Sequence, residues 1–273
     1  MLSTATLNGW YPGADRIGIP ASNFAVNHAG RAAIVLHTMA GHMAGTIAYF
    51  TDPARRVSAH FAIDPAGHVK QFVSVDNAAY GNGLSWSDRN RCWIDPDGHL
   101  LKSPHPSPSW AGLRPPTNPN QTTISIELDG YPEDPIPAAM YDALIALLHW
   151  LSATFPVTLG SYTVGKNLVG HRDISPVSRP HCPGPRVDFV ALAAAANEPR
   201  VAPGAGTYRV TFGTAVYEAP RGDAPIALGR TAVVLSSNIV EVDSVTNGFA
   251  HLASSSPTMA DVGFVPVSTL ERI

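Results

Sequence analysis

One apolar run of the sequence ends directly in an imidazole: Ala32-Ala33-Ile34-Val35-Leu36-His37. An uninterrupted apolar run of this length is typical of a strand that is buried on both faces of a sheet. The run therefore predicts a central strand that delivers the side chain of His37 to one edge of that sheet.

Two tracts far downstream carry further metal-binding side chains, Gly170-His171-Arg172-Asp173 and Pro180-His181-Cys182-Pro183-Gly184. Imidazole nitrogen and thiolate sulfur are ligands that zinc accepts. His37, His171 and Cys182 together offer two nitrogens and one sulfur, which leaves the fourth position of a tetrahedral Zn²⁺ free for water. Three protein ligands and one open position characterise a catalytic zinc site. The sequence therefore predicts a zinc hydrolase.

Strand-like and helix-like segments alternate up to about residue 196, which indicates an α/β domain with its site along one edge of a central sheet. Residues 138–154 have apolar side chains at helical spacing, namely Tyr141, Leu144, Ile145, Leu148 and Leu151. The other expected elements are a helix at 41–49, a hairpin formed by 56–64 and 68–73, and a strand at 123–128. The segment 84–117, dense in Pro, Ser and Trp, is expected to be a long loop.

The composition changes after the first 196 residues. Pro, Gly and Asn concentrate in residues 197–206, which is a linker signal. Short alternating apolar runs separated by turn residues follow in 207–273, and they favour a small all-β barrel. The expected organisation is a catalytic domain at 1–196, a linker at 197–206 and a barrel domain at 207–273.

Composition also excludes several classes of function. The formal net charge of -3 gives no basic footprint for nucleic acid. No apolar run approaches the roughly 18 residues of a membrane span, and the N-terminal residues show no secretory signal. The two cysteines, Cys92 and Cys182, are better explained as a free thiol and a metal thiolate than as a disulfide.

Five blocks in the order of one known family connect these features: Val35-Leu36-His37, Val57-Ser58-Ala59-His60-Phe61-Ala62-Ile63-Asp64, Ile124-Ser125-Ile126-Glu127-Leu128-Asp129-Gly130, Val169-Gly170-His171-Arg172-Asp173 and Cys182-Pro183-Gly184. From about Ala32 to Gly184 the chain resembles the zinc-dependent N-acetylmuramoyl-L-alanine amidases of type 2, whose fold is a mixed sheet flanked by helices. The resemblance implies that His37, His171 and Cys182 bind zinc. It also implies cleavage of the amide between N-acetylmuramic acid and L-alanine in bacterial peptidoglycan.

Residues 207–273 resemble, more weakly, the bacterial Src-homology-3-like domains that bind cell walls. With the missing signal peptide, this resemblance implies a modular bacteriophage endolysin, held in the host cytoplasm until its release to the cell wall. Two alternatives remain: a non-catalytic peptidoglycan-binding protein of the same fold, and a wall-recycling amidase that acts on soluble muropeptides.

Two charged residues are candidates for catalysis. Glu127 interrupts an apolar strand, where burying a carboxylate costs free energy unless the group has a partner or a catalytic role. We therefore expect Glu127 to be the general base. The alternative is that it pairs with a basic residue on an exposed face of the strand. Members of the family usually carry a lysine two residues before the last ligand, where this chain has Pro180. Arg179 is the expected substitute that stabilises the oxyanion, against the alternative of a solvated loop arginine.

Two further histidines have open assignments. His181 competes with Cys182 for the metal, although Cys182 precedes Pro183-Gly184 as the ligand of the family does. His60 occupies a position that lines the groove in the family, so we expect it to contact substrate; the alternative is that it only packs in the core.

Overall fold

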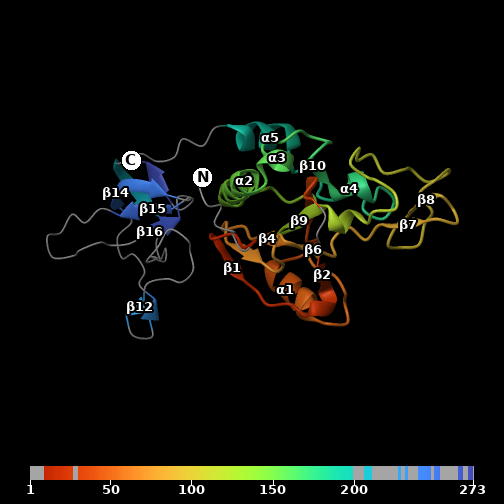
Figure 1. The fold of residues 1–273 in the computed structure, drawn as a ribbon, viewed down its shortest axis with the longest axis horizontal. Coiled ribbons are helices and arrows are strands. Elements are labelled where there is room, and N and C mark those ends of the chain that lie inside the picture. Colours follow the sequence, from red (N-terminus) through yellow and green to blue (C-terminus); the bar gives the residue numbers. More distant parts are fainter. Residues whose placement is uncertain are drawn as a thin grey trace, which may run out of the picture. The chain divides into compact units, whose positions relative to one another are not determined.

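The structure, a computed structural model, describes residues 9–26 and 30–198 together with short strands of the C-terminal part (Figure 1). The chain divides into two compact units, Met1–Glu198 and Pro199–Ile273. This boundary falls inside the predicted linker of residues 197–206. Asn197, which was expected in the linker, is still the last residue of a helix.

A six-stranded sheet forms the centre of the first unit, in the order β1-β5-β4-β9-β3-β10. Its strands are β1 (Ala14–Arg16), β3 (Ala33–Thr38), β4 (Phe61–Ile63), β5 (Val69–Gln71), β9 (Thr123–Leu128) and β10 (Leu168–Gly170). The β4–β5 pair is antiparallel and the other pairs are parallel. The predicted α/β fold with a central mixed sheet is therefore confirmed.

Side chains of the central strands alternate between two buried layers, as the pleat of a strand requires. Ile34, Leu36 and Ile126 pack on one face against helices α2 (Ala138–Thr154) and α5 (Phe189–Asn197). On the other face, Val35 packs against Trp93 and Trp110 of the segment predicted as a long loop. Because His37 follows Leu36 and Glu127 follows Ile126, both point to this second face.

The remaining elements are short and cover the sheet. They are α1 (Met43–Thr51), α3 (Pro156–Leu159), α4 (His171–Ile174), the 3-10 turns η1 (Ala21–Asn23) and η2 (Pro119–Gln121), and the paired strands β2 (Phe24–Val26) with β6 (Asn77–Ala79) and β7 (Ser85–Ser87) with β8 (Cys92–Ile94). The segment 84–117 thus contains a small hairpin within the predicted loop. Among the described helices, none combines the length and the apolar character that a membrane span requires.

The bounds of two helices, α1 and α2, can be compared with the ranges predicted from the sequence. Helix α2 has the bounds that its apolar spacing predicted. Helix α1 begins at Met43 instead of at residue 41, because its first turn is capped from another element. The Asp129 carboxylate accepts hydrogen bonds from the Met43 N–H, at 2.7 Å, and from His42 Nδ1, at 2.8 Å. A carboxylate at this end also complements the helix dipole.

The described strands of the second unit form an antiparallel five-stranded sheet in the order β16-β15-β14-β11-β17 and a separate two-stranded pair, β12–β13. Their bounds are β11 (Gly206–Val210), β12 (Ala227–Leu228), β13 (Thr231–Ala232), β14 (Ile239–Thr246), β15 (Phe249–Leu252), β16 (Phe264–Pro266) and β17 (Leu270–Arg272). The predicted closure into a small all-β barrel depends on residues outside the described ones.

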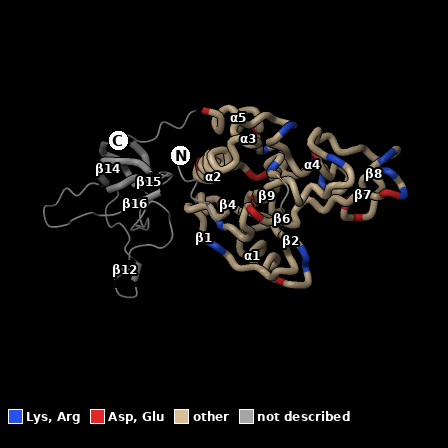
Figure 2. The backbone as a smooth tube through the Cα atoms, in the orientation of Figure 1, with Lys and Arg blue, Asp and Glu red and all other residues tan. Residues whose placement is uncertain are grey.

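Charged residues of both signs are interspersed along the first unit (Figure 2).

We expect Leu144→Ala to lower the free energy of unfolding of the first unit by about 2–5 kcal/mol. Leu144 lies on α2 with no exposed surface, so the substitution leaves a cavity against the sheet. Val157→Ala is the matched control, since 97% of Val157 is exposed. Urea unfolding followed by tryptophan fluorescence reports on this unit alone, because all five tryptophans precede residue 199. Equal losses in both variants would contradict the assignment of this core.

Candidate metal centre and active site

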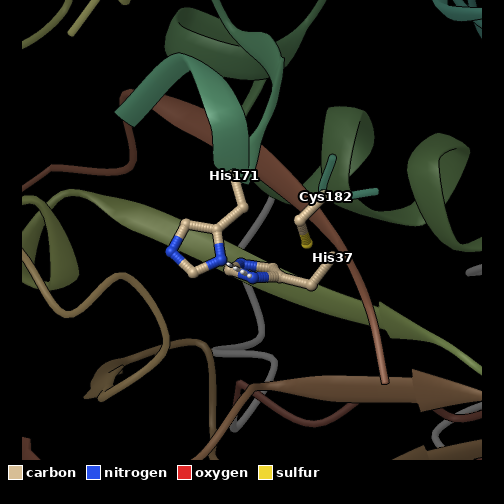
Figure 3. Close-up of side chains that lie close together, drawn as sticks. All are labelled: His37, His171 and Cys182. Carbon is tan, nitrogen blue, oxygen red and sulfur yellow. Dashed lines mark hydrogen bonds between the residues drawn. The ribbon is translucent and has the colours of Figure 1, made fainter. Parts of the chain in front are cut away.

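Three potential metal ligands converge at the carboxyl end of the sheet (Figure 3). His37 is the penultimate residue of β3, His171 opens α4 directly after β10, and Cys182 lies in the loop that follows. All three side chains are buried, and one donor atom from each lies within 4.8 Å of the others. His37 Nδ1 and His171 Nδ1 are 2.9 Å apart.

The parallel pairing of β3 with β10 creates this arrangement. Val169 and Gly170 lie opposite Val35 and Leu36, so the next residues, His171 and His37, emerge at the same edge. Gly170 allows the ligand loop to approach, since a Cβ at this position would lie 2.8 Å from Pro183 Cδ. The carboxylate of Asp173 accepts the Gly170 N–H at 2.8 Å and fixes the turn into α4.

Burial keeps both imidazoles neutral. Desolvation lowers the pKa of His37 well below its usual value and lowers that of His171 to about 4. His171 Nε2 donates to the carbonyl oxygen of Asn82 at 3.1 Å, which leaves the lone pair on Nδ1. Two neutral imidazole nitrogens that point to one place are suited to share a cation. Asn82 was not identified from the sequence, since its role consists only of a backbone contact with a distant residue.

Cys182 completes a donor set of two nitrogens and one sulfur, which fits zinc. The Thr38 N–H donates to Cys182 Sγ at 3.3 Å. Burial raises the pKa of the Cys182 thiol to about 12, so in the absence of a metal the thiol is neutral, and a bound cation is what would deprotonate it. His181 is exposed and does not join the cluster.

Glu127 lies next to the cluster of His37, His171 and Cys182. It is the register partner of His37 on the adjacent strand β9. Burial raises the pKa of Glu127 to about 7, against the smaller opposite effect of the Arg179 charge. Its Oε2 atom is buried and has no hydrogen-bond partner among the described residues. A carboxylate with a pKa near neutrality is suited to accept and return a proton.

Arg179 is exposed, and its Nη1 donates to the carbonyl oxygen of Ser178 at 2.7 Å. The guanidinium is close enough for its charge to lower the pKa values of His37, His171 and Glu127, in each case after the larger effect of burial. The described structure thus places a positive charge beside the cluster without a direct hydrogen bond to it.

His60, the residue predicted to contact substrate, is fully buried. Its side chain has no exposed surface. One ring nitrogen lies 3.0 Å from the carbonyl oxygen of Asn77, and the other accepts the Ser125 N–H at 3.1 Å. Burial lowers the pKa of His60 to about 3. Both ring nitrogens thus link neighbouring backbone segments, and the contact with substrate stays a prediction.

A second group of potential ligands, Asp95, Asp97 and His99, belongs to a turn. Asp95 Oδ1 accepts the N–H groups of Asp97 and His99. The same Asp-Pro-X-Gly-His turn recurs at residues 64–68, where the equivalent carboxylate makes the same two bonds and Ala66 replaces Asp97. Since the turn forms without the third ligand, its hydrogen bonds account for the cluster without a metal.

Comparison with known proteins agrees with this geometry. Residues 27–185, more than half of the chain, match the family model described as N-acetylmuramoyl-L-alanine amidase. The 1,6-anhydro-N-acetylmuramyl-L-alanine amidase AmpD of Escherichia coli (strain K12) is 30% identical over 135 residues, or 49% of this chain and 55% of that protein. The protein of the same name from Enterobacter cloacae is 28% identical over 134 residues, or 49% of this chain and 54% of that protein. The chain thus spans about half the length of these curated relatives.

The fold is shared with a solved structure of a selenomethionine AmpD derivative. The two superpose with a TM-score of 0.50 at 23% identity, covering 69% of this chain and 97% of that chain. The match of residues 27–185 includes β3, β9 and β10 and all three ligands of the cluster. This chain belongs to the N-acetylmuramoyl-L-alanine amidase family.

Proposed function

We propose that this protein is a zinc-dependent amidase that hydrolyses the bond between N-acetylmuramic acid and the L-alanine of the peptidoglycan stem peptide. The observation that carries the proposal is the convergence of His37, His171 and Cys182 beside the half-buried Glu127, whose Oε2 atom is buried. The family match supports the class of bond that is cleaved. The donor set of two nitrogens and one sulfur supports zinc as the metal.

The residues of the site have distinct tasks in this reaction. His37, His171 and Cys182 hold the zinc, which when bound supplies Lewis acidity toward a carbonyl oxygen and toward water. Glu127 accepts the proton of the attacking water at its unpartnered Oε2 atom and later delivers that proton to the leaving amine. Arg179 provides positive charge beside the developing oxyanion.

The biological setting that we propose is a modular bacteriophage endolysin. The second compact unit supports it, because an appended β-rich module suits attachment to a polymeric wall. In this setting the enzyme stays in the host cytoplasm until release and then acts on the bacterial wall.

A second setting, recycling of soluble muropeptides, is favoured by the name of the curated relatives, 1,6-anhydro-N-acetylmuramyl-L-alanine amidase. Digestion of purified sacculi and of soluble anhydro-muropeptides, each analysed by mass spectrometry, separates the two settings. An endolysin releases stem peptides with new L-alanine amino termini from intact sacculi, whereas a recycling enzyme acts only on the soluble substrate. A non-catalytic binding protein of the same fold cleaves neither.

We expect His37→Ala, His171→Ala and Cys182→Ser each to lose most of the bound zinc and most of the activity. A site with three protein ligands binds about one zinc per chain, and its affinity for zinc falls sharply when any one ligand is removed. Elemental analysis of purified protein measures the metal. Cys92→Ser is the matched control, since this buried thiol lies outside the cluster. Full zinc in Cys182→Ser together with none in His181→Ala would transfer the ligand role to His181.

We expect Glu127→Gln to keep the fold and the zinc but to lower kcat by about two to four orders of magnitude, the usual contribution of a general base. The amide has the shape of the carboxylate but cannot accept the proton. Glu133→Gln, at an exposed carboxylate, is the control. Rates are measured by amino-terminus release from a soluble muropeptide. Wild-type turnover in Glu127→Gln would remove this residue from the mechanism.

We expect a chain that ends at Pro203 to hydrolyse soluble muropeptides at the full rate and to clear intact walls more slowly. All proposed site residues lie in the first compact unit, which has its own core. Loss of the second unit then removes only affinity for the polymer. Sedimentation of residues 199–273 with purified sacculi tests the binding directly. Failure to sediment, together with unimpaired wall clearing by the shortened chain, would exclude a targeting role.

A further inference from the structure

One guanidinium connects the ends of the two strands that carry the proposed metal ligand and general base. Arg186 Nη2 donates to Thr38 Oγ1 at 3.0 Å, to the carbonyl oxygen of Leu128 at 3.2 Å and to that of Asp129 at 3.1 Å. Its Nη1 also reaches the Asp129 carbonyl oxygen at 3.1 Å. Thr38 is the last residue of β3 and Leu128 is the last residue of β9, and the pairing of the two strands ends with them.

Two of the contacts of Arg186, Thr38 and Leu128, lie one residue away from the site. His37 directly precedes Thr38, and Glu127 directly precedes Leu128. The Thr38 N–H contacts Cys182 Sγ, and the Thr38 hydroxyl donates to the carbonyl oxygen of Gly130 at 2.8 Å. A displacement of Thr38 relative to Leu128 would therefore move a nitrogen ligand, the sulfur ligand and the carboxylate relative to one another.

The surroundings of Arg186 accommodate a planar group with several donors. Gly130 has φ +104, and a Cβ at this position would lie 3.0 Å from Arg186 Nη1. Burial lowers the pKa of Arg186, and its Nε atom is buried with no hydrogen-bond partner among the described residues. The carboxylates of Asp134 and Asp129 act in the opposite direction on this pKa, although neither forms an ion pair with Arg186 in the described part of the chain. Its charge is thus placed at the strand ends at a desolvation cost, and its terminal nitrogens bind carbonyl and hydroxyl oxygens there.

We propose that Arg186 is a positioning residue: it clamps the ends of β3 and β9 and so fixes Glu127 relative to the zinc ligands. Its hydrogen bonds go to Thr38, Leu128 and Asp129, and its charge also acts on the Cys182 thiol. The proposal rests on the amidase function proposed above. A lysine cannot replace it, because an ammonium group lacks the planar fork that reaches several acceptors at once. Misplacement of a catalytic group by about 1 Å can lower a rate by about 100-fold.

The test compares Arg186→Lys and Arg186→Ala with the wild-type full-length chain. Zinc release to a chelator and the kcat and KM for a soluble muropeptide are measured below the unfolding temperature of each variant. We expect kcat to fall about 10- to 100-fold in Arg186→Lys with KM unchanged, and zinc to be released faster. Added guanidinium ion is expected to restore part of the kcat of Arg186→Ala, whereas ammonium ion does not. Arg55→Lys is the control, since Arg55 pairs with Asp52 on the surface.

A second pair of variants keeps the test valid if the Arg186 variants fold poorly. Thr38→Val removes the hydroxyl at nearly constant shape, and Thr38→Ser retains it. We expect a lower kcat and faster zinc release in Thr38→Val, with Thr38→Ser close to wild type. In a double-mutant cycle, the loss of kcat caused by Arg186→Lys should be smaller in the Thr38→Val background than in the wild-type background. The reason is that both substitutions break the same clamp.

Wild-type kcat and zinc release in Arg186→Lys would overturn the proposal. So would a loss of activity that matches only the loss of folded protein and is not rescued by guanidinium. If the wild-type protein cleaves no muropeptide while the Arg186 variants still release zinc faster, the proposed amidase function fails and the clamp on the metal ligands stands. If wild type is active and the variants are indistinguishable from it in both measurements, only the clamp fails.

Discussion

The parallel pairing of β3 with β9 and β10 is the constraint on which the site depends. Parallel strands end at the same edge of a sheet, so this pairing gathers residues that are far apart in the chain. It places His171 beside His37 and sets Glu127 opposite His37. The geometry is rigid because both layers of the central strands are packed, by α2 and α5 on one face and by α1 and residues 84–113 on the other.

Burial sets the protonation behaviour of the side chains in this site. Removal from water disfavours charge, so the imidazoles of His37 and His171 are held neutral and the pKa of Glu127 rises to about 7. Neutral imidazoles bind a metal, and a carboxylate with this pKa exchanges protons near neutral pH. His60 is buried in the same way, but backbone groups occupy both of its nitrogens, which leaves it a structural part of the sheet.

The segment 84–117 shows how an irregular stretch contributes to a rigid site. Trp93 and Trp110 pack on the face of the sheet to which His37 points. The Trp110 N–H groups also bond to the carbonyl oxygens of Asp173 and Lys166, which flank the β10 to α4 turn. This segment therefore helps to hold the turn that presents His171.

Elements with local signals could be predicted from the amino-acid sequence alone. The apolar run before His37, the strand 123–128 and the helix 138–154 follow from periodicity, and the ligand types follow from the chemistry of histidine and cysteine. The folded chain was needed to show that His60 is enclosed and that Asn82 orients His171. It was also needed to show that Asp129 caps α1 and that Arg186 joins two strand ends. Each of these depends on a contact between residues distant in the chain, and such contacts arise from strand register and packing, which leave no periodic pattern in the sequence.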